Sequence, residues 1–228
     1  MAEQEGVIKF DLRYRRTTAE DTWAGVLEAH TLLRNLDGWR AVLRRLALLG
    51  SDPDRYDGYG FGNLSHRLTG SGPAVGRSFV ISGSQTGHLP ALGKEGWARV
   101  DRWDAIANRI EASGPIRPSS ESLTHAAVYD AVPAARAVLH VHSPELWGGA
   151  ADLGLQTTGD AIPYGTPEMA AEVARLVVPA GGGGAPPKTG LFVMAGHEDG
   201  VVAWGPSLSA AGTVLVTALG EALALGST

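Results

Sequence analysis

Hydrophobic and polar residues alternate near the start of the chain, where Ile8, Phe10, Leu12 and Tyr14 are separated by charged residues. A period of two is typical of a strand that buries one of its faces. The pattern therefore predicts a strand over residues 7–15.

The next part of the chain changes to a helical period. Residues 17–21 have the composition of a helix start, and apolar positions then predict helices over 19–35 and 38–49, separated at Asp37-Gly38. Residues 51–62 are rich in Gly, Asp and Tyr, which predicts a loop.

The remaining sequence alternates between short apolar runs and helical segments, without repeats or a domain boundary. We expect strands over residues 64–69, 77–82, 106–112, 136–142, 191–196 and 201–205. We expect helices from Pro118 to about Val132, from Ser143, over 166–178 and over 207–225. The glycine-rich residues 181–187 read as a surface connector, so a single domain over residues 1–228 is expected.

His140-Val141-His142 ends the apolar run that begins at Ala137. Alternate side chains of a strand point to the same face, so both imidazoles could offer a ring nitrogen to one ion. His197 directly follows another apolar run and could be a third ligand. Three histidines with an open position form a normal catalytic Zn²⁺ site, although each histidine could equally be an ordinary core or surface residue.

Three further segments combine polar side chains with a backbone that could approach a ligand. Pro118-Ser119-Ser120-Glu121 is suited either to plain helix capping or to an anion site at a helix N-terminus. Residues 60–67 contain glycines and Asn63, and residues 82–87 form a hydroxyl-rich turn. Both segments could be simple turns, or could bring the backbone and polar groups close to a ligand.

Composition restricts this chemistry. The chain has no cysteine, so thiolate ligands and disulfides are excluded and any metal must use His, Asp or Glu. The net charge of −5 and the absence of a Lys/Arg run argue against nucleic-acid binding. We expect no membrane association, because no apolar stretch approaches the ~20 residues of a membrane span. The polar, acidic residues 1–5 do not resemble a secretory signal, and a cytoplasmic location is expected.

Taken in order, these motifs resemble the class II aldolase/adducin family. The matching segments are GNLSHR (62–67), TG (86–87), PSSES (118–122), HVH (140–142) and GHEDGVVAWGPSLSAA (196–211). They lie within residues 22–222, the family core, and residues 1–17 remain as an extra N-terminal strand. The resemblance implies a three-layer α/β/α fold of class α/β, with a central and mainly antiparallel sheet, and a homotetramer.

The resemblance also implies roles for individual residues. His140, His142 and His197 would hold a divalent metal, usually Zn²⁺, although Mn²⁺, Co²⁺ or Fe²⁺ also suit an all-nitrogen site. Glu121 would be the catalytic acid/base. The phosphate of a small-molecule substrate would be bound by Gly62, Asn63, Thr86, Gly87, Ser119 and Ser120.

The chemistry implied is that of a metal-dependent lyase. The metal would stabilise an enediolate while Glu121 moves a proton, and we expect aldolase-type C–C cleavage of a small, phosphorylated ketose-like substrate. Decarboxylation, dehydration and epimerisation use the same intermediate and stay open, as does a non-catalytic assembly role like that of adducin heads. Retention of the metal ligands and Glu121 favours an enzyme.

Some residues leave alternatives open. Glu198-Asp199 separate His197 from Gly200, whereas in the family the glycine follows the histidine at once. These two residues could approach the metal or lie in a solvated loop. His125, one helical turn after Glu121, could orient that carboxylate or simply pack, and Tyr164 could line the pocket.

Overall fold

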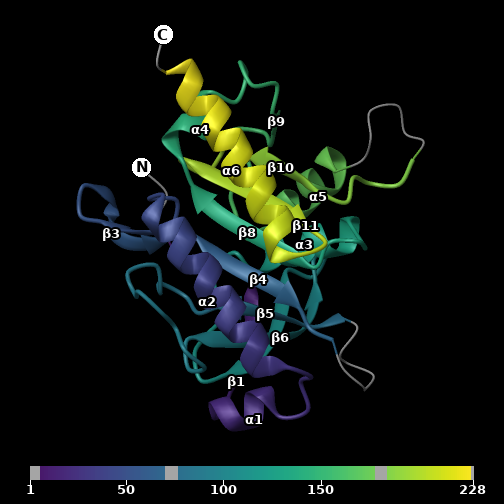
Figure 1. The fold of residues 1–228 in the computed structure, drawn as a ribbon. Coiled ribbons are helices and arrows are strands. Elements are labelled where there is room, and N and C mark those ends of the chain that lie inside the picture. The colour runs from purple at the N-terminus through teal and green to yellow at the C-terminus, as the bar shows by residue number, and fades with distance from the viewer. Residues whose placement is uncertain (1–5, 70–76, 178–183, 227–228) are drawn as a thin grey trace.

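A nine-stranded sheet forms the centre of the protein, which is described here by a computed structural model covering residues 6–69, 77–177 and 184–226 (Figure 1). The strand order is β1-β7-β6-β5-β4-β8-β11-β10-β9. Only the β1–β7 and β9–β10 pairs are parallel, and the other six are antiparallel. The strands are β1 (Asp11–Arg16), β4 (Asn63–Arg67), β5 (Phe79–Ser82), β6 (Trp97–Asp104), β7 (Arg109–Gly114), β8 (Ala137–His142), β9 (Gln156–Thr157), β10 (Gly190–Val193) and β11 (Gly200–Gly205).

Helices cover both faces of this sheet. They are α1 (Ala19–Trp23), α2 (Ala29–Arg45), α3 (Ser122–Ala131), α4 (Pro144–Gly148), α5 (Pro167–Leu176) and α6 (Leu208–Leu225). One apolar cluster joins the sheet to α2, α4 and α6, and a second joins the opposite face to α3 and α5. The expected three-layer α/β/α fold with a mainly antiparallel sheet is thereby confirmed.

Local signals in the sequence set several helix starts. The side chains of Ser143, Thr166 and Ser207 each accept a hydrogen bond from the backbone N–H three residues ahead, which satisfies a donor that the helix leaves unpaired. Proline follows the cap at the start of α4 and α5, where its fixed φ suits the first turn.

Three expectations about the elements are wrong. The predicted break at Asp37-Gly38 is absent because α2 runs through it; the chain instead turns before α2, where Gly25 and Glu28 have positive φ. The predicted loop over residues 51–62 largely forms a hairpin of β2 (Gly50–Asp52) and β3 (Arg55–Phe61). The prediction also lacked β6, whose Trp97 and Val100 are buried between β5 and β7.

The N-terminal strand begins later than predicted. β1 pairs with β7 only from Asp11 to Arg16, and residues 6–10 precede the sheet. The expectations for residues 1–5 and for the first three residues of the glycine-rich connector, 181–183, concern segments outside the described residues.

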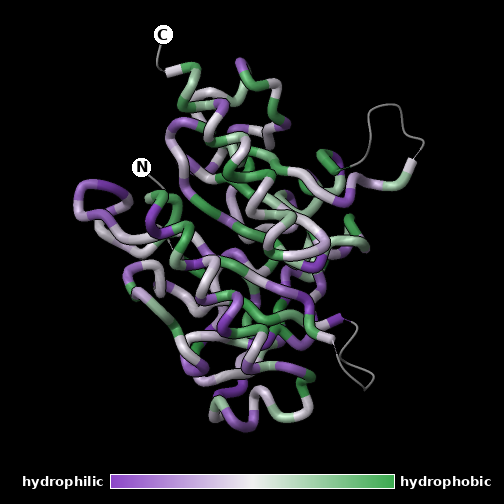
Figure 2. The backbone as a smooth tube through the Cα atoms, in the orientation of Figure 1, coloured by the Kyte–Doolittle hydropathy of each residue, from purple (hydrophilic) through white to green (hydrophobic). Residues whose placement is uncertain are grey.

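The final helix qualifies the expectation about apolar stretches. α6 is 18 residues long and is apolar enough to span a membrane by length and composition alone. Figure 2 shows apolar residues along this helix and along the central strands. Because Leu208, Leu215 and Leu219 are among its seven buried residues and join the core cluster with Leu139 and Val201, α6 packs as a core helix.

Candidate active site

Three histidines meet at one end of the β8–β11 pair. Ala137, Leu139 and Val141 of β8 face the cluster of α2 and α6, so His140 and His142 point to the opposite face, toward α3. His197 lies in the tight turn between β10 and β11, where its N–H donates to the Met194 carbonyl and its own carbonyl accepts from Gly200. One ligand atom from each of the three rings lies within 4.8 Å of the other two.

The protonation state of these rings suits metal binding. All three are buried, and this burial lowers the pKa of His140 to about 4 while a hydrogen bond with the Val201 backbone opposes the shift. The pKa values of His142 and His197 also lie well below the usual range. Burial is the larger cause, and neighbouring positive charge is the smaller one. Neutral imidazole is the form that binds a cation, and three such ligands match a catalytic divalent-metal site with an open position.

Glu121 lies directly beside this cluster. Its Oε1 is 3.8 Å from Nε2 of His197 and 4.0 Å from Nε2 of His140, and the side chain is 1% exposed. α3 begins one residue later than Glu121, and this carboxylate makes no capping hydrogen bond to the helix. In the turn that leads into α3, Ser119 Oγ accepts a hydrogen bond from the Glu121 N–H at 3.2 Å. A carboxylate in this position could exchange a proton with a molecule bound at the histidine cluster.

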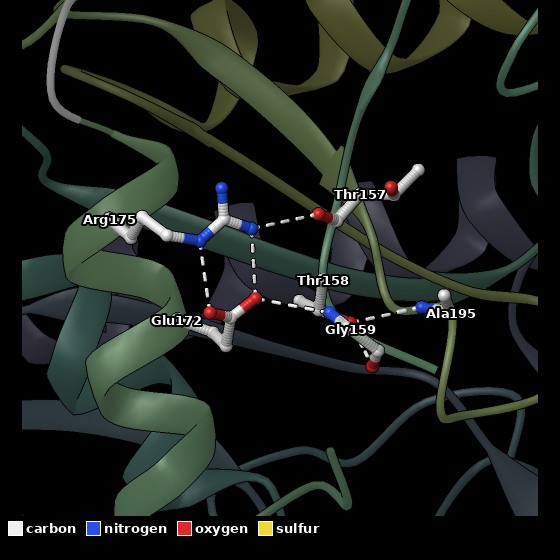
Figure 3. A network of polar contacts seen from close by, with 6 residues as sticks. All are labelled: Thr157, Thr158, Gly159, Glu172, Arg175 and Ala195. Carbon is white, nitrogen blue, oxygen red and sulfur yellow. Dashed lines mark hydrogen bonds and ion pairs between the residues drawn. The ribbon is translucent and has the colours of Figure 1, made fainter. Parts of the chain in front are cut away.

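A polar network holds the turn that carries His197 (Figure 3). Thr158 follows β9, and its Oγ1 accepts a hydrogen bond from the Ala195 N–H at 3.0 Å. The Glu172 carboxylate of α5 accepts hydrogen bonds from the Gly159 N–H and from Nε and Nη2 of Arg175. Arg175 Nη2 also donates to the Thr157 carbonyl. The network therefore ties α5 and β9 to the turn two residues before His197.

The predicted phosphate-binding residues converge from three segments. Asn63 lies opposite His140 in the β4–β8 register, Ser82 Oγ accepts from the Leu64 N–H, and the Ser82 carbonyl accepts from the Ser119 N–H. These contacts bring the start of β4, the turn after β5 and the serine pair Ser119-Ser120 into one region. Asn63, Thr86, Ser119 and Ser120 are all buried.

Glycine is favoured at one position of this region, Gly62, and required at another, Gly87. Gly62 has φ +76°, a conformation that other residues adopt at a cost, and it connects β3 to β4. A Cβ on Gly87 would lie 2.2 Å from the Gly50 carbonyl, so no side chain fits there. The Thr86 hydroxyl donates to the Gly83 carbonyl, which fixes the turn rather than leaving that proton for a ligand.

A buried arginine behind the same turn escaped the sequence interpretation. Arg40 is 0% exposed and donates to the Thr86 and Leu89 carbonyls, and Arg44 donates to the Gly87 carbonyl. Burial lowers the pKa of Arg40 to about 10, which still leaves the guanidinium charged at neutral pH. The only sign of this buried residue in the sequence is weak: the helical pattern of residues 38–49 places an arginine at a position that faces the core.

The β2–β3 hairpin was also missed as part of the site. Its Tyr56 ring packs on His142 and Phe61, and the Tyr56 hydroxyl hydrogen-bonds to Asp199. Arg55 pairs with the same carboxylate at 3.0 Å. Asp199 is therefore a buried structural partner rather than part of a solvated loop, whereas Glu198 is exposed to solvent.

The other open residues now have places. His125 is fully buried and forms a chain with Ser65 and Tyr129, in which Ser65 Oγ lies 2.7 Å from both His125 Nδ1 and the Tyr129 hydroxyl. Tyr164 lines the cluster, with its ring centroid 4.7 Å from that of His197.

Comparisons with known proteins show relatives of this chain in sequence and in fold. Methylthioribulose-1-phosphate dehydratase from Gluconacetobacter diazotrophicus is 34% identical over 128 residues, which is 55% of this chain and 55% of the dehydratase. The match thus spans only about half the length of that relative.

Two solved structures share the fold. YgbL from Escherichia coli, described as a putative aldolase/epimerase/decarboxylase, gives a TM-score of 0.60 at 20% identity, covering 86% of this chain and 88% of YgbL. L-Fuculose-1-phosphate aldolase from Thermus thermophilus gives a TM-score of 0.57 at 18% identity, covering 85% of this chain and 92% of the aldolase. Residues 51–219 match the family described as Class II Aldolase and Adducin N-terminal domain. The chain therefore belongs to the class II aldolase and adducin family.

Proposed function

We propose that this protein is a metal-dependent lyase acting on a small phosphorylated sugar derivative, with Glu121 as its acid/base. The observation that carries this proposal is the position of the Glu121 carboxylate, 3.8–4.0 Å from two imidazole nitrogens of a buried three-histidine cluster. A histidine cluster with a purely structural role needs no buried carboxylate within reach of its ligand atoms. Proton transfer to or from a bound substrate requires such a group.

His140, His142 and His197 would hold the metal, and the all-nitrogen donor set suits Zn²⁺ or a related divalent ion. When bound, such a metal supplies Lewis-acid stabilisation of the negative charge that develops on a substrate carbonyl oxygen. The protein's own contribution is to present three neutral rings in fixed positions and to exclude water from them.

Gly62, Asn63, Thr86, Gly87, Ser119 and Ser120 would bind the substrate phosphate. The Asn63 amide, the serine hydroxyls and the backbone N–H groups of the turn offer donors, and the buried charge of Arg40 behind the turn favours an anion. Phosphate bound there would orient the carbonyl end of the substrate toward Glu121.

Glu121 serves either of two bond cleavages. In dehydration, the Glu121 carboxylate takes a proton from the carbon next to the carbonyl and passes that proton to the hydroxyl on the following carbon, which leaves as water. In C–C cleavage, Glu121 takes the proton of that hydroxyl, the C–C bond breaks, and the proton is returned to the carbon that gained the electron pair.

The dehydratase relative makes dehydration the first reaction to test. The initial expectation of C–C cleavage is kept as the second candidate, because the same carboxylate and ligands serve both. We also propose a homo-oligomer, expected to be a tetramer, which light scattering would measure directly.

The decisive assay supplies metal-loaded protein with methylthioribulose 1-phosphate and, separately, with fuculose 1-phosphate, and follows products by NMR. We expect turnover of one phosphorylated substrate by the wild type and none by Glu121→Gln carrying the same metal content. Near-normal turnover by Glu121→Gln would refute the assigned role, and inactivity of the wild type across a panel of phosphorylated ketoses would refute the lyase proposal.

A further inference from the structure

The segment before β1 runs over the candidate active site. Phe10 is buried in the core cluster that also contains Tyr164, which fixes the end of this segment. The Val7 N–H donates to the Tyr164 hydroxyl at 3.1 Å. At the far end, a Cβ on Gly6 would lie 3.1 Å from Cγ of Gln85, so the segment reaches the turn that carries Thr86.

This path brings Lys9 to the histidine cluster. Its Nζ is fully buried and lies 3.7 Å from the centroid of the Tyr164 ring, in a cation–π contact. Tyr164 also packs on His197, at 4.7 Å between ring centroids, and His197 Nε2 is 3.8 Å from the Glu121 carboxylate. Lys9, Tyr164, His197 and Glu121 therefore form one continuous contact region.

The electrostatics of Lys9 follow from this placement. Burial lowers the pKa of the Lys9 ammonium, and the Glu121 carboxylate opposes that shift. The contacts of Lys9 with the Tyr164 ring, and of that ring with His197, place the ammonium group at the edge of the candidate site, where it can influence a charge on a bound substrate.

We propose that Lys9 is a positioning residue of the active site, whose ammonium group, carried in by residues 6–10, holds the Glu121 carboxylate in place for proton transfer. The proposal rests on the lyase function proposed above and adds a residue from outside the matched family region, which begins at residue 51. It assigns to the N-terminal segment a role in the reaction rather than one in packing alone.

Packing alone does not account for this arrangement. The buried apolar anchor of the segment is Phe10, and the Val7 hydrogen bond uses the backbone, so neither needs a lysine at position 9. Burying an ammonium group is costly unless a charged partner offsets the loss of hydration. Lys9 is one of three lysines in the chain, and Lys188 lies exposed in the loop before β10.

The absence of cysteine allows a charge-specific test. In Lys9→Cys, the new thiolate displaces bromide from 2-bromoethylamine, which restores an ammonium group at nearly the original distance. Iodoacetamide gives a neutral adduct of similar size as the matched control. Lys9→Met and Lys188→Met complete the set, and each form is measured for kcat, KM and Zn²⁺ affinity.

We expect Lys9→Met and the iodoacetamide adduct to lose about 100-fold in kcat with little change in KM, and aminoethylation to restore most of it. Zn²⁺ affinity should be equal to or tighter than that of the wild type, because a like charge near the metal is removed. Lys188→Met should behave as wild type.

Equal activity of the neutral and aminoethyl adducts, or a change confined to KM, would overturn the proposal. So would weaker Zn²⁺ binding by Lys9→Met, because that result indicates a structural role. The metal measurement remains informative if no substrate is found, so failure of the lyase proposal and failure of the Lys9 proposal can be told apart.

Discussion

The ring of Tyr56 lies edge-on against His142, with the ring centroids 4.6 Å apart and the planes at 73°. Because the Tyr56 hydroxyl is bound to Asp199, this contact fastens the β2–β3 hairpin to the turn that follows His197. One aromatic side chain thus supports two of the three candidate metal ligands, His142 on β8 and His197 in the turn between β10 and β11.

Removing the Tyr56 hydroxyl should loosen this support. We expect Tyr56→Phe to lower the free energy of unfolding by about 1 kcal/mol through the lost hydrogen bond to Asp199, and to weaken Zn²⁺ binding several-fold. Tyr56→Ala also removes the ring and should have a larger effect on both. Urea unfolding and metal titration measure these changes, and a Tyr56→Phe variant with wild-type values for both would contradict the supporting role.

The hydroxyl of Thr158 should matter for the placement of His197. Thr158→Val keeps the shape of the side chain but leaves the Ala195 N–H without its acceptor, at a cost of about 1–3 kcal/mol. We expect reduced stability together with weaker metal binding, measured on the same preparation. Arg175→Met, at the exposed edge of the same network, is the control and should change stability by less than about 1 kcal/mol.

The sequence predicted the residues of the site better than the path of the chain around them. The spacing of His140 and His142 at the end of one apolar run, and the position of His197 after another, were enough to suggest the ligands, because strand periodicity directly fixes the side-chain direction. The β2–β3 hairpin was not predictable, since its glycines and aspartates are typical of loops and its pairing depends on contacts with Phe61 and His142. The same holds for Lys9, whose approach to Tyr164 follows from the β1–β7 pairing and has no local signature.

Acidic pH should destabilise the metal-free protein through its buried imidazoles. Unfolded histidines titrate near 6.5, whereas burial lowers the pKa of His140 to about 4 and lowers those of His142 and His197 as well. Between these values the unfolded chain binds more protons than the folded one. The free energy of unfolding should therefore fall as the pH drops from about 6.5 toward 4, with no contribution from these groups above 6.5.

Urea unfolding of the metal-free protein at pH 7.5 and pH 5 tests this dependence. His142→Gln should lose part of the difference between the two pH values, because one titrating ring is gone. An unchanged pH dependence in His142→Gln would show that the buried rings are not its source.

The proposed phosphate site makes a separate prediction at Asn63. Asn63→Asp preserves the size of this buried side chain and introduces a carboxylate where a phosphate is expected. We expect KM for a phosphorylated substrate to rise by at least about tenfold through like-charge repulsion, while the metal content is retained. Titration with inorganic phosphate gives the same comparison without turnover. Unchanged phosphate affinity would place the anion elsewhere.

The central claim is that His140, His142 and His197 hold one metal ion beside Glu121. Calorimetric titration of the metal-free protein with Zn²⁺ tests it most directly, on the wild type, Glu121→Gln and His142→Ala. The account predicts one ion per chain for the first two and loss of that site in His142→Ala. Stoichiometric Zn²⁺ bound by His142→Ala with wild-type affinity, or none bound by the wild type, would contradict it.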